Sequence, residues 1–196
     1  MELNGVKIGV ALTGSFCTFE KIFIELEKLV KAGAEVYTIV SDATQQIESR
    51  FGTPEEYMRR LEEITGKKPM QTISEAEHVG PQSLFDVMVI FPCTGNTAAK
   101  LANGITDTPV LMGAKAHLRN NKPLVISIST NDALGMNMKN IGLLLNAKNI
   151  YFVPFGQDNP KKKNNSLIAH VDKLIPTLEL ALENRQYQPL LQGFEE

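Results

Sequence analysis

DVMVIFPCTGNTAAKLANG, residues 86–104, places a run of apolar residues directly before a cluster of small polar ones. Continuous rather than alternating hydrophobicity predicts a strand that is buried on both faces, as in a parallel sheet covered by helices. Pro92 is predicted to end this strand, because proline has no N–H group to donate to a neighbouring strand. Residues 94–97 then fall where the next helix is predicted to begin.

Four further runs of the same character are predicted to form strands, and helical candidates lie between them and after the last. The strands are expected at residues 6–13, 35–41, 122–130 and 149–155. The helices are expected at residues 19–32, 54–65, 96–103, 110–120, 135–147 and 166–183. Because strands separated by helices need crossover connections, the pattern predicts an α/β fold: a three-layer, doubly wound, Rossmann-like sandwich with a mainly parallel sheet. Pro176 is expected to kink the last helix.

Composition limits the setting of the protein. The chain has 196 residues, 43% of them hydrophobic, so we expect a single domain over residues 1–196 with a C-terminal helix and tail from about 166. A formal net charge of −2 favours neither nucleic acid nor a membrane as a partner. The acidic N-terminus, with no cleavage site after it, predicts a cytoplasmic protein. Cys17 and Cys93 are too few for a disulfide framework or a metal site.

Small hydroxyl, amide and glycine residues follow nearly every predicted strand. Parallel strands bring their carboxyl ends to one edge of the sheet, where ligands bind and helix N-termini present free N–H groups. One such residue alone indicates a helix cap, but several at one edge favour a ligand site. The candidates are Gly14, Ser15, Ser41, Thr94, Gly95, Asn96, Thr97, Ser129, Thr130 and Asn131.

The glycine pattern narrows the class of ligand. The first loop contains Gly9, Gly14 and Ser15 but lacks G-x-G-x-x-G, which disfavours NAD binding by this chain alone. The absence of a Walker A lysine after a glycine loop disfavours a nucleoside triphosphate. A phosphorylated planar ligand, such as a mononucleotide or a flavin, is therefore predicted.

PCTGNT, residues 92–97, resembles the P-A-S-A-N-T type motif of a flavoprotein family that includes FMN-dependent cysteine decarboxylases and prenyl-transferring flavin enzymes. GVALTGSFCTFE (9–20), KPLVISISTN (122–131) and NIGLLLNAKNIYFVP (140–154) are similar to family segments in the same order. The resemblance spans most of residues 5–156 and implies the flavoprotein fold with FMN as cofactor. The cofactor-binding residues that it implies are Gly14, Ser15, Phe16, Ser41, Thr94, Gly95, Asn96, Thr97 and Ser129.

Two catalytic residues are implied by the same resemblance. His78 lies eight residues before Asp86, the spacing of the family's active-site histidine, which implies a base; the alternative is an exposed turn. Asn131 falls on the asparagine of the family's P-A-M-N motif. The full P-A-M-N-x-x-M clamp reads STNDALG here, and this departure argues against peptide-cysteine decarboxylation. Asp132 could act as a base or cap the following helix.

Two other kinds of side chain could take part in the chemistry. Cys93 could act as a nucleophile if a helix N-terminus lowered its pKa, but a small buried cysteine needs no such role. Lys100, Lys115 and Arg119 could pair with substrate carboxylates or remain exposed helical charges.

STNDALGMN (129–137), PVLMGAKAHLRNNKP (109–123) and FVPFGQDNPKKKNNS (152–166) resemble one branch of the family. Members of that branch act with an NAD(P)-binding, dehydrogenase-like partner subunit to oxidise a small cyclic dicarboxylate in the mother cell of sporulating bacteria. The resemblance implies an oxidoreductase subunit that forms a homo-oligomer, a trimer or a multiple of one, with NAD(P) held by the partner. Two alternatives stay open: a non-catalytic assembly partner with a degenerate flavin pocket, or an FMN-dependent decarboxylase of a small acid.

Overall fold

The computed structural model describes residues 3–194, and a mostly parallel sheet forms its centre. The sheet order is β2-β1-β3-β4-β7-β6, and β5 also pairs with β4. The parallel strands are β1 (Lys7–Leu12), β2 (Glu35–Val40), β3 (Val87–Cys93), β4 (Leu124–Thr130) and β5 (Ile150–Phe152). Two short strands, β6 (Phe155–Gly156) and β7 (Leu167–Ala169), continue the sheet in the antiparallel sense. The predicted α/β fold with a mainly parallel sheet is confirmed.

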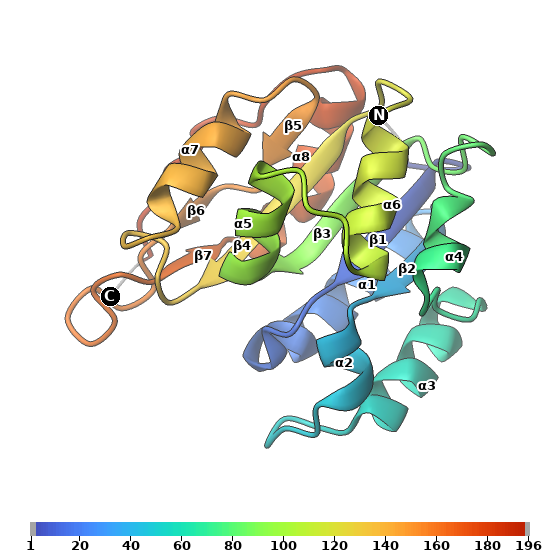
Figure 1. Cartoon of the computed structure of the whole chain (residues 1–196), viewed down its shortest axis with the longest axis horizontal. Coiled ribbons are helices and arrows are strands. Elements are labelled where there is room, and N and C mark those ends of the chain that lie inside the picture. Colours follow the sequence, from blue (N-terminus) through green and yellow to red (C-terminus); the bar gives the residue numbers. More distant parts are fainter. Residues whose placement is uncertain (1–2, 195–196) are drawn as a thin grey trace.

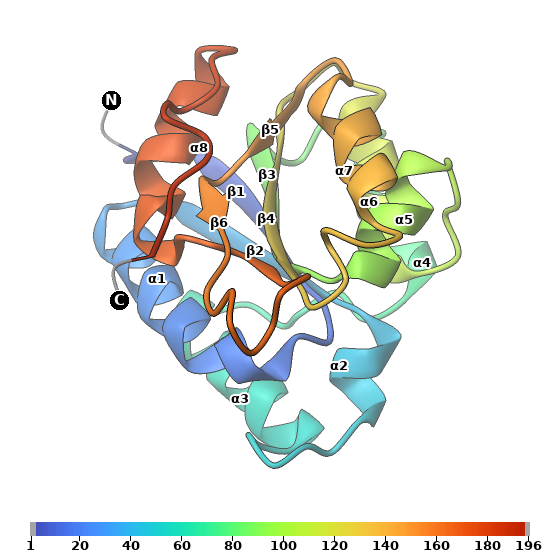
Figure 2. The same ribbon diagram turned by 90° about the vertical axis from the view of Figure 1, so that its left-hand side faces the viewer.

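Helices cover both faces of this sheet (Figure 1, Figure 2). One face carries α1 (Phe19–Lys31) and α8 (Leu174–Leu182), and the other carries α5 (Gly95–Ala102), α6 (Pro109–Leu118) and α7 (Met138–Leu145). The remaining helices, found toward the β2 end of the sheet, are α2 (Asp42–Gln46), α3 (Pro54–Thr65) and α4 (Ile73–Glu77). No helix within residues 3–194 is both long and apolar enough to span a lipid bilayer.

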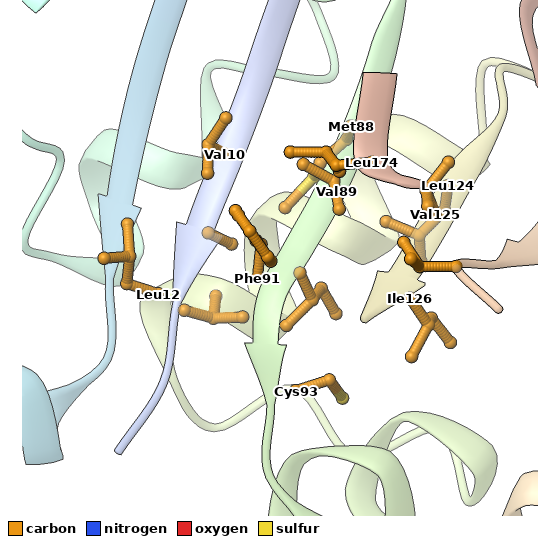
Figure 3. Packing of buried hydrophobic residues seen from close by; sticks show 14 of the residues in the cluster. Val10, Leu12, Met88, Val89, Phe91, Cys93, Leu124, Val125, Ile126 and Leu174 are labelled. Atoms are coloured by element: carbon orange, nitrogen blue, oxygen red, sulfur yellow. The ribbon is translucent and has the colours of Figure 1, made fainter. Parts of the chain in front are cut away.

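The core lies between the sheet and its helices. Every residue of β3 is buried, which agrees with its unbroken apolar sequence. Figure 3 shows side chains of β1, β3 and β4 packed closely together, with Leu174 of α8 against them. Gly9 in β1 lets the Phe85 ring pack directly on the strand backbone, because a Cβ atom there would overlap the ring. Each fully buried Leu, Ile or Phe side chain contributes roughly 1.5–3 kcal/mol of transfer free energy.

Pro92 lies inside β3 and does not end it, contrary to the prediction. The pairing of β3 with β4 shifts register between Ile90 and Cys93. Proline is tolerated at such an irregularity because the ladder hydrogen bond that its missing N–H would make is not needed there. The strand therefore continues through Pro92 and delivers Cys93 to the edge where α5 begins.

The predicted helix over residues 166–183 is wrong in its first half. Residues 167–169 form β7, residues 171–173 form a short 3-10 turn, and α8 begins at Leu174. β7 pairs with the end of β4, Ile168 opposite Ser129, and this tertiary pairing overrides the helical pattern. Pro176 then falls in the first turn of α8, where the N–H that it lacks would have no helical partner, so the predicted kink has no cause.

Non-strand segments contact both outer strands of the sheet. At one side, the Val40 N–H of β2 donates to the Met70 carbonyl at 3.0 Å, and the Met70 N–H donates to the Thr38 carbonyl at 2.8 Å. At the other side, the Phe155 N–H of β6 donates to the Leu190 carbonyl at 3.0 Å, and the Gln192 N–H donates back to the Phe155 carbonyl at 3.1 Å. The C-terminal tail thus lies along β6.

Candidate functional site

A cleft of about 590 Å³ opens at the carboxyl ends of β1, β3 and β4. Its walls are the loop after β1, the start of α5, the residues that follow β4, and the segment that leads into β7. The volume falls within the range of about 300–1,000 Å³ that is typical of small-molecule sites. The predicted residues that line it are Gly14, Ser15, Thr94, Gly95, Asn96, Ser129, Thr130, Asn131 and Asp132.

Buried hydrogen bonds of one threonine join the ends of β1 and β3. Thr13 Oγ1 donates to the Pro92 carbonyl at 2.6 Å and accepts from the Thr94 N–H at 3.0 Å. Thr13 is 1% exposed, and its bond to the Pro92 carbonyl is buried, whereas the bond from the Thr94 N–H is partly buried. The single hydroxyl fixes the β1 loop against the first residues of α5.

A second contact joins the β1 loop to β4. Ser15 Oγ and Ser129 Oγ share a hydrogen bond of 2.8 Å, although the two residues are 114 positions apart. Thr18 Oγ1 holds the other side of the loop by donating to the Ser15 carbonyl at 2.8 Å. The two serine hydroxyls therefore lie side by side in the cleft as a ready pair of donors and acceptors.

The N-terminus of α5 faces the same cleft. Thr94 caps the helix, and its Oγ1 accepts from the Thr97 N–H at 3.3 Å. The N–H groups of Gly95 and Asn96 belong to the first turn, where backbone donors have no partner within the helix. Such a helix start favours an anionic ligand group, through its N–H donors and through the helix dipole.

Asp132 is held in a fixed orientation beside α5. Its Oδ1 accepts from Thr130 Oγ1 at 2.5 Å and from Asn137 Nδ2 at 3.0 Å, and its Oδ2 accepts from Asn137 Nδ2 at 2.9 Å. Asn140 Nδ2 in turn donates to Asn137 Oδ1 at 2.9 Å, which fixes the amide. The three groups nearest a Cβ atom built on Gly95 are Asn137 Nδ2, Thr130 Oγ1 and Asp132 Oδ1, so this network is packed directly on the helix start.

A more apolar hollow of about 520 Å³ adjoins the cleft, and Asp158 lines both. The β6 strand, the beginning of α7 and the C-terminal tail surround it; among its lining residues are Leu134, Met138, Phe155 and Leu191. Polar and apolar ligand groups could thus be accommodated on either side of Asp158. Within residues 3–194, no group of His, Cys, Asp and Glu side chains is arranged to hold a metal ion.

Comparison with known proteins places the chain in a family. Residues 1–171 match the family model described as Flavoprotein. The chain belongs to the flavoprotein family. The predicted resemblance to flavoproteins related to FMN-dependent cysteine decarboxylases is thereby confirmed.

Individual relatives of this flavoprotein agree with the family match. The chain is 50% identical to the B subunit of dipicolinate synthase from Bacillus subtilis over 190 residues, which cover 97% of this chain and 95% of that protein. The crystal structure of the dipicolinate synthase B subunit from Bacillus halodurans has 47% identity and a TM-score of 0.91, with both chains fully covered. The FMN-dependent cysteine decarboxylase SpaF shares the fold, with a TM-score of 0.64 at 21% identity over 93% of this chain and 98% of that one.

Four residues predicted for the flavoprotein site do not line the cleft. Phe16 stacks on the Tyr57 ring with the ring centroids 5.9 Å apart, and Ser41 caps α2 by accepting from the Thr44 N–H. Thr97 is buried, and its Oγ1 lies 3.0 Å from that of Thr94. Phe16 and Thr97 belong to two elements that border the cleft, the loop after β1 and α5, whereas the α2 helix that Ser41 caps does not line it.

His78 is the fourth, and it lies away from the cleft. It is exposed at the end of α4. Two residues later, the Gly80 carbonyl accepts from Asn120 Nδ2 at 2.8 Å, and Asn120 comes between α6 and the start of β4. This position is at the amino edge of the sheet, opposite the cleft. A role for His78 as a base stays a prediction, and it would require the cleft of a second chain.

Five lining residues were not predicted: Cys17, Asp158, Lys163, Ser166 and Ile168. Four of them come from residues 158–168, a segment whose polar part has the composition of a solvated loop and whose last part was assigned to a helix. The pairing of β7 with β4 is what brings this segment to the cleft. The three adjacent lysines at 161–163 were the available signal, since a basic run in a loop after a strand can serve an anionic ligand.

We expect iodoacetamide at about pH 8 to modify Cys17 in the folded flavoprotein and to leave Cys93 unmodified. Cys17 is exposed at the cleft, whereas burial raises the pKa of Cys93 to about 12, so its reactive thiolate is scarce. Peptide mass spectrometry would measure both sites, with labelling in guanidinium as the control in which both react. Equal labelling of Cys93 in the folded chain would contradict its structural role.

Proposed function

We propose that this chain acts as the B subunit of a dipicolinate synthase. Together with a dehydrogenase-like A subunit, it would oxidise a dihydrodipicolinate precursor to dipicolinate during sporulation, in the cytoplasm of the mother cell. The observation that carries the proposal is the similarity to the Bacillus subtilis protein over nearly the full length of both chains. A cleft of suitable size at the carboxyl edge of the sheet supports it.

The cleft residues fit FMN as a cofactor in part. The paired hydroxyls of Ser15 and Ser129 and the N–H groups at the start of α5 suit a phosphate, and Gly14 leaves backbone open to it. The Asp132 carboxylate lies in the same cleft and opposes a second negative charge close to it. When bound, FMN would supply a two-electron acceptor at the carboxyl edge of the sheet.

The chain's own residues can orient and deprotonate a small ring. Oxidation of a dihydro ring removes one proton and one hydride, and in this proposal NAD(P)+ on the partner subunit is the final acceptor of the hydride, with or without FMN bound in the cleft. Asp132 offers a fixed carboxylate that can accept the proton at Oδ2, because Thr130 and Asn137 hold its orientation. Asn131 lines the same wall and can donate a hydrogen bond to a ring carboxylate.

A second candidate function is a non-catalytic assembly partner with a degenerate flavin pocket. One observation favours it: the described cleft has two carboxylates, Asp132 and Asp158, among its lining residues but none of the chain's three histidines. The third candidate, an FMN-dependent decarboxylase of a small acid, rests on family resemblance alone.

The proposal includes contacts with further chains, both the A subunit and copies of this chain. Large apolar side chains are exposed on and before α7, among them Met136, Leu143 and Leu145. Exposed apolar groups close to a binding cleft are typical of surfaces that another protein covers. A homo-oligomer, a trimer or a multiple of one, is the expected assembly.

Co-purified chain and A subunit are expected to form dipicolinate from the dihydro precursor with NAD(P)+, and neither protein alone should do so at a comparable rate. Product is measured by its ultraviolet absorbance. A visible spectrum of the isolated chain with added FMN, followed by assay of released flavin, separates the candidates. Stoichiometric flavin without product would favour a decarboxylase, and neither flavin nor product would favour the assembly partner.

A further inference from the structure

A row of three asparagine side chains runs from the end of α5 to Asp132. Asn137 comes directly before α7 and Asn140 lies in its first turn, and the two residues are 7% and 5% exposed. Asn140 Nδ2 donates to Asn137 Oδ1 at 2.9 Å, and Asn103, the C-cap of α5, has its Nδ2 at 3.4 Å from Asn140 Oδ1. Because α5 and α7 lie side by side on one face of the sheet, the row bridges the two helices (Figure 2). Each side-chain polar atom of the two buried amides therefore has a partner.

The hydrogen bonds of this row run in one direction, toward Asp132. An asparagine amide has a donor end and an acceptor end, so the orientation of one amide decides that of the next. At one end of the row, Asn103 Nδ2 also donates to the Ala99 carbonyl at 2.7 Å, and a carbonyl can only accept. At the other end, the Asp132 carboxylate can only accept as well, which requires the amide nitrogen of Asn137. Both ends thus favour the same arrangement, in which Asn140 presents its nitrogen to Asn137.

Asn140 decides which end of the Asn137 amide faces Asp132, although Asn140 itself does not line the cleft. If the Asn137 amide turned over, its oxygen would face the Asp132 carboxylate, and two negatively polarised acceptors would repel each other. The nitrogen of Asn137 would then face Asn140 Nδ2, so two donors would also meet. The Asn140 donor therefore opposes this rotation and keeps a hydrogen-bond donor on Asp132.

One acceptor position of the Asp132 carboxylate remains open. Oδ1 accepts from Thr130 Oγ1 and from Asn137 Nδ2, whereas Oδ2 accepts from Asn137 Nδ2 alone. Because each carboxylate oxygen can accept about two hydrogen bonds, Oδ2 has room for one more. Asp132 is an exposed residue that lines the cleft, so a ligand bound there can reach its carboxylate.

We propose that Asn140 is a positioning residue for the reaction in the cleft: it holds the Asn137 amide so that its nitrogen stays on Asp132 and Oδ2 stays open to accept a proton. Asn140 acts only through Asn137 and touches no substrate. The inference rests on the proposed function, in which Asp132 accepts the proton of the ring. It deepens that function by assigning a residue outside the cleft to the same step.

A double-mutant cycle tests the direction of the row without any ligand. Asn140→Asp places an acceptor opposite Asn137 Oδ1, so the Asn137 amide is expected to turn over and to bring its oxygen against Asp132. Adding Asp132→Asn supplies an amide donor for that oxygen. Each single change should destabilise the chain. The double variant should have an equilibrium constant of unfolding roughly tenfold or more below the value expected from combining the two single effects. Denaturation of the full chain in its native assembly, at one fixed concentration, measures all four proteins.

Steady-state kinetics of the chain with its A subunit test the effect on the reaction. Asn140→Ala removes the donor without introducing a charge. We expect kcat to fall roughly tenfold or more, because Asp132 loses its orientation for proton transfer, while KM changes by less than about threefold. A residue that served packing alone would lower stability and leave the kcat of the folded protein unchanged.

Asn146 provides the matched controls, because it is exposed at the C-terminal end of the same helix. Asn146→Asp introduces the same charge as Asn140→Asp, but its effect on stability should simply add to that of Asp132→Asn. Asn146→Ala should retain the kcat of the unmodified chain.

Two results would overturn the assignment: additive effects of Asn140→Asp and Asp132→Asn, or a kcat of Asn140→Ala equal to that of Asn146→Ala. If Asn140→Asp alone does not fold, folding of the double variant supports the assignment, and a double variant that also fails to fold leaves the decision to the kcat of Asn140→Ala. Failure of the proposed function has another signature. The unmodified pair of subunits would then form no dipicolinate, and the stability cycle would still decide whether Asn140 orients Asp132.

Discussion

Replacing Thr13 by valine is expected to lower the free energy of unfolding by about 2–4 kcal/mol. Valine keeps the shape of the side chain but removes the hydroxyl that donates to the Pro92 carbonyl and accepts from the Thr94 N–H. Two backbone groups at the junction of β3 and α5 would then lose their partner, the Pro92 carbonyl at a buried position and the Thr94 N–H at a partly buried one. Chemical denaturation monitored by circular dichroism measures the change.

Thr38→Val is the matched control for this substitution. Thr38 is also 1% exposed, but its Oγ1 is buried without a hydrogen-bond partner among the described residues. Removing an unpaired buried hydroxyl should leave stability unchanged or raise it by about 1 kcal/mol. If the two variants were equally destabilised, the loss would reflect strand packing, and the role assigned to the Thr13 hydroxyl would be wrong.

Gly95→Ala is expected to weaken binding at the cleft by roughly a hundredfold. The added Cβ would lie 2.6 Å from Asn137 Nδ2 and Thr130 Oγ1 and 2.8 Å from Asp132 Oδ1, distances at which these groups must move. Their displacement breaks the hydrogen bonds that orient Asp132 and shifts the first turn of α5. Calorimetric titration with dipicolinate and with FMN measures the loss.

Gly142→Ala serves as its control. Gly142 lies on the exposed side of α7, and no atom lies within 4 Å of the position that its Cβ would take. Alanine there should leave binding unchanged and add roughly 0.5–1 kcal/mol of stability through helix propensity. Full binding by Gly95→Ala would show that the helix start does not contact the ligand.

The parallel part of the fold could be predicted from the sequence because each of its strands is a continuous apolar run. β3 shows why. It lies between two other strands and both of its faces are covered, so nearly all of its residues are apolar. The residues at the strand ends followed from the same logic, since parallel strands carry Ser15, Thr94 and Ser129 to one edge.

The wall formed by residues 157–169 could not be predicted in the same way. Leu167 and Ala169 are buried because β7 pairs with β4. This contact joins residues nearly forty positions apart, so the local sequence pattern does not predict it. Asp158 and Lys163 reach the cleft through that pairing, and in an otherwise loop-like sequence only the lysine run at 161–163 pointed to an anionic ligand. His78 was singled out by its spacing before Asp86; it lies exposed at the end of α4, outside the cleft of its own chain, and its role stays a prediction.

The segments that lie along the outer strands bear on how copies of the chain can join. Met70 occupies hydrogen-bonding groups of β2, and the tail around Leu190 occupies those of β6. An edge strand with its backbone groups already engaged is a poor template for another chain. We therefore expect assembly to proceed face to face, through side chains on helices and loops, and not by extending the sheet from one molecule into the next.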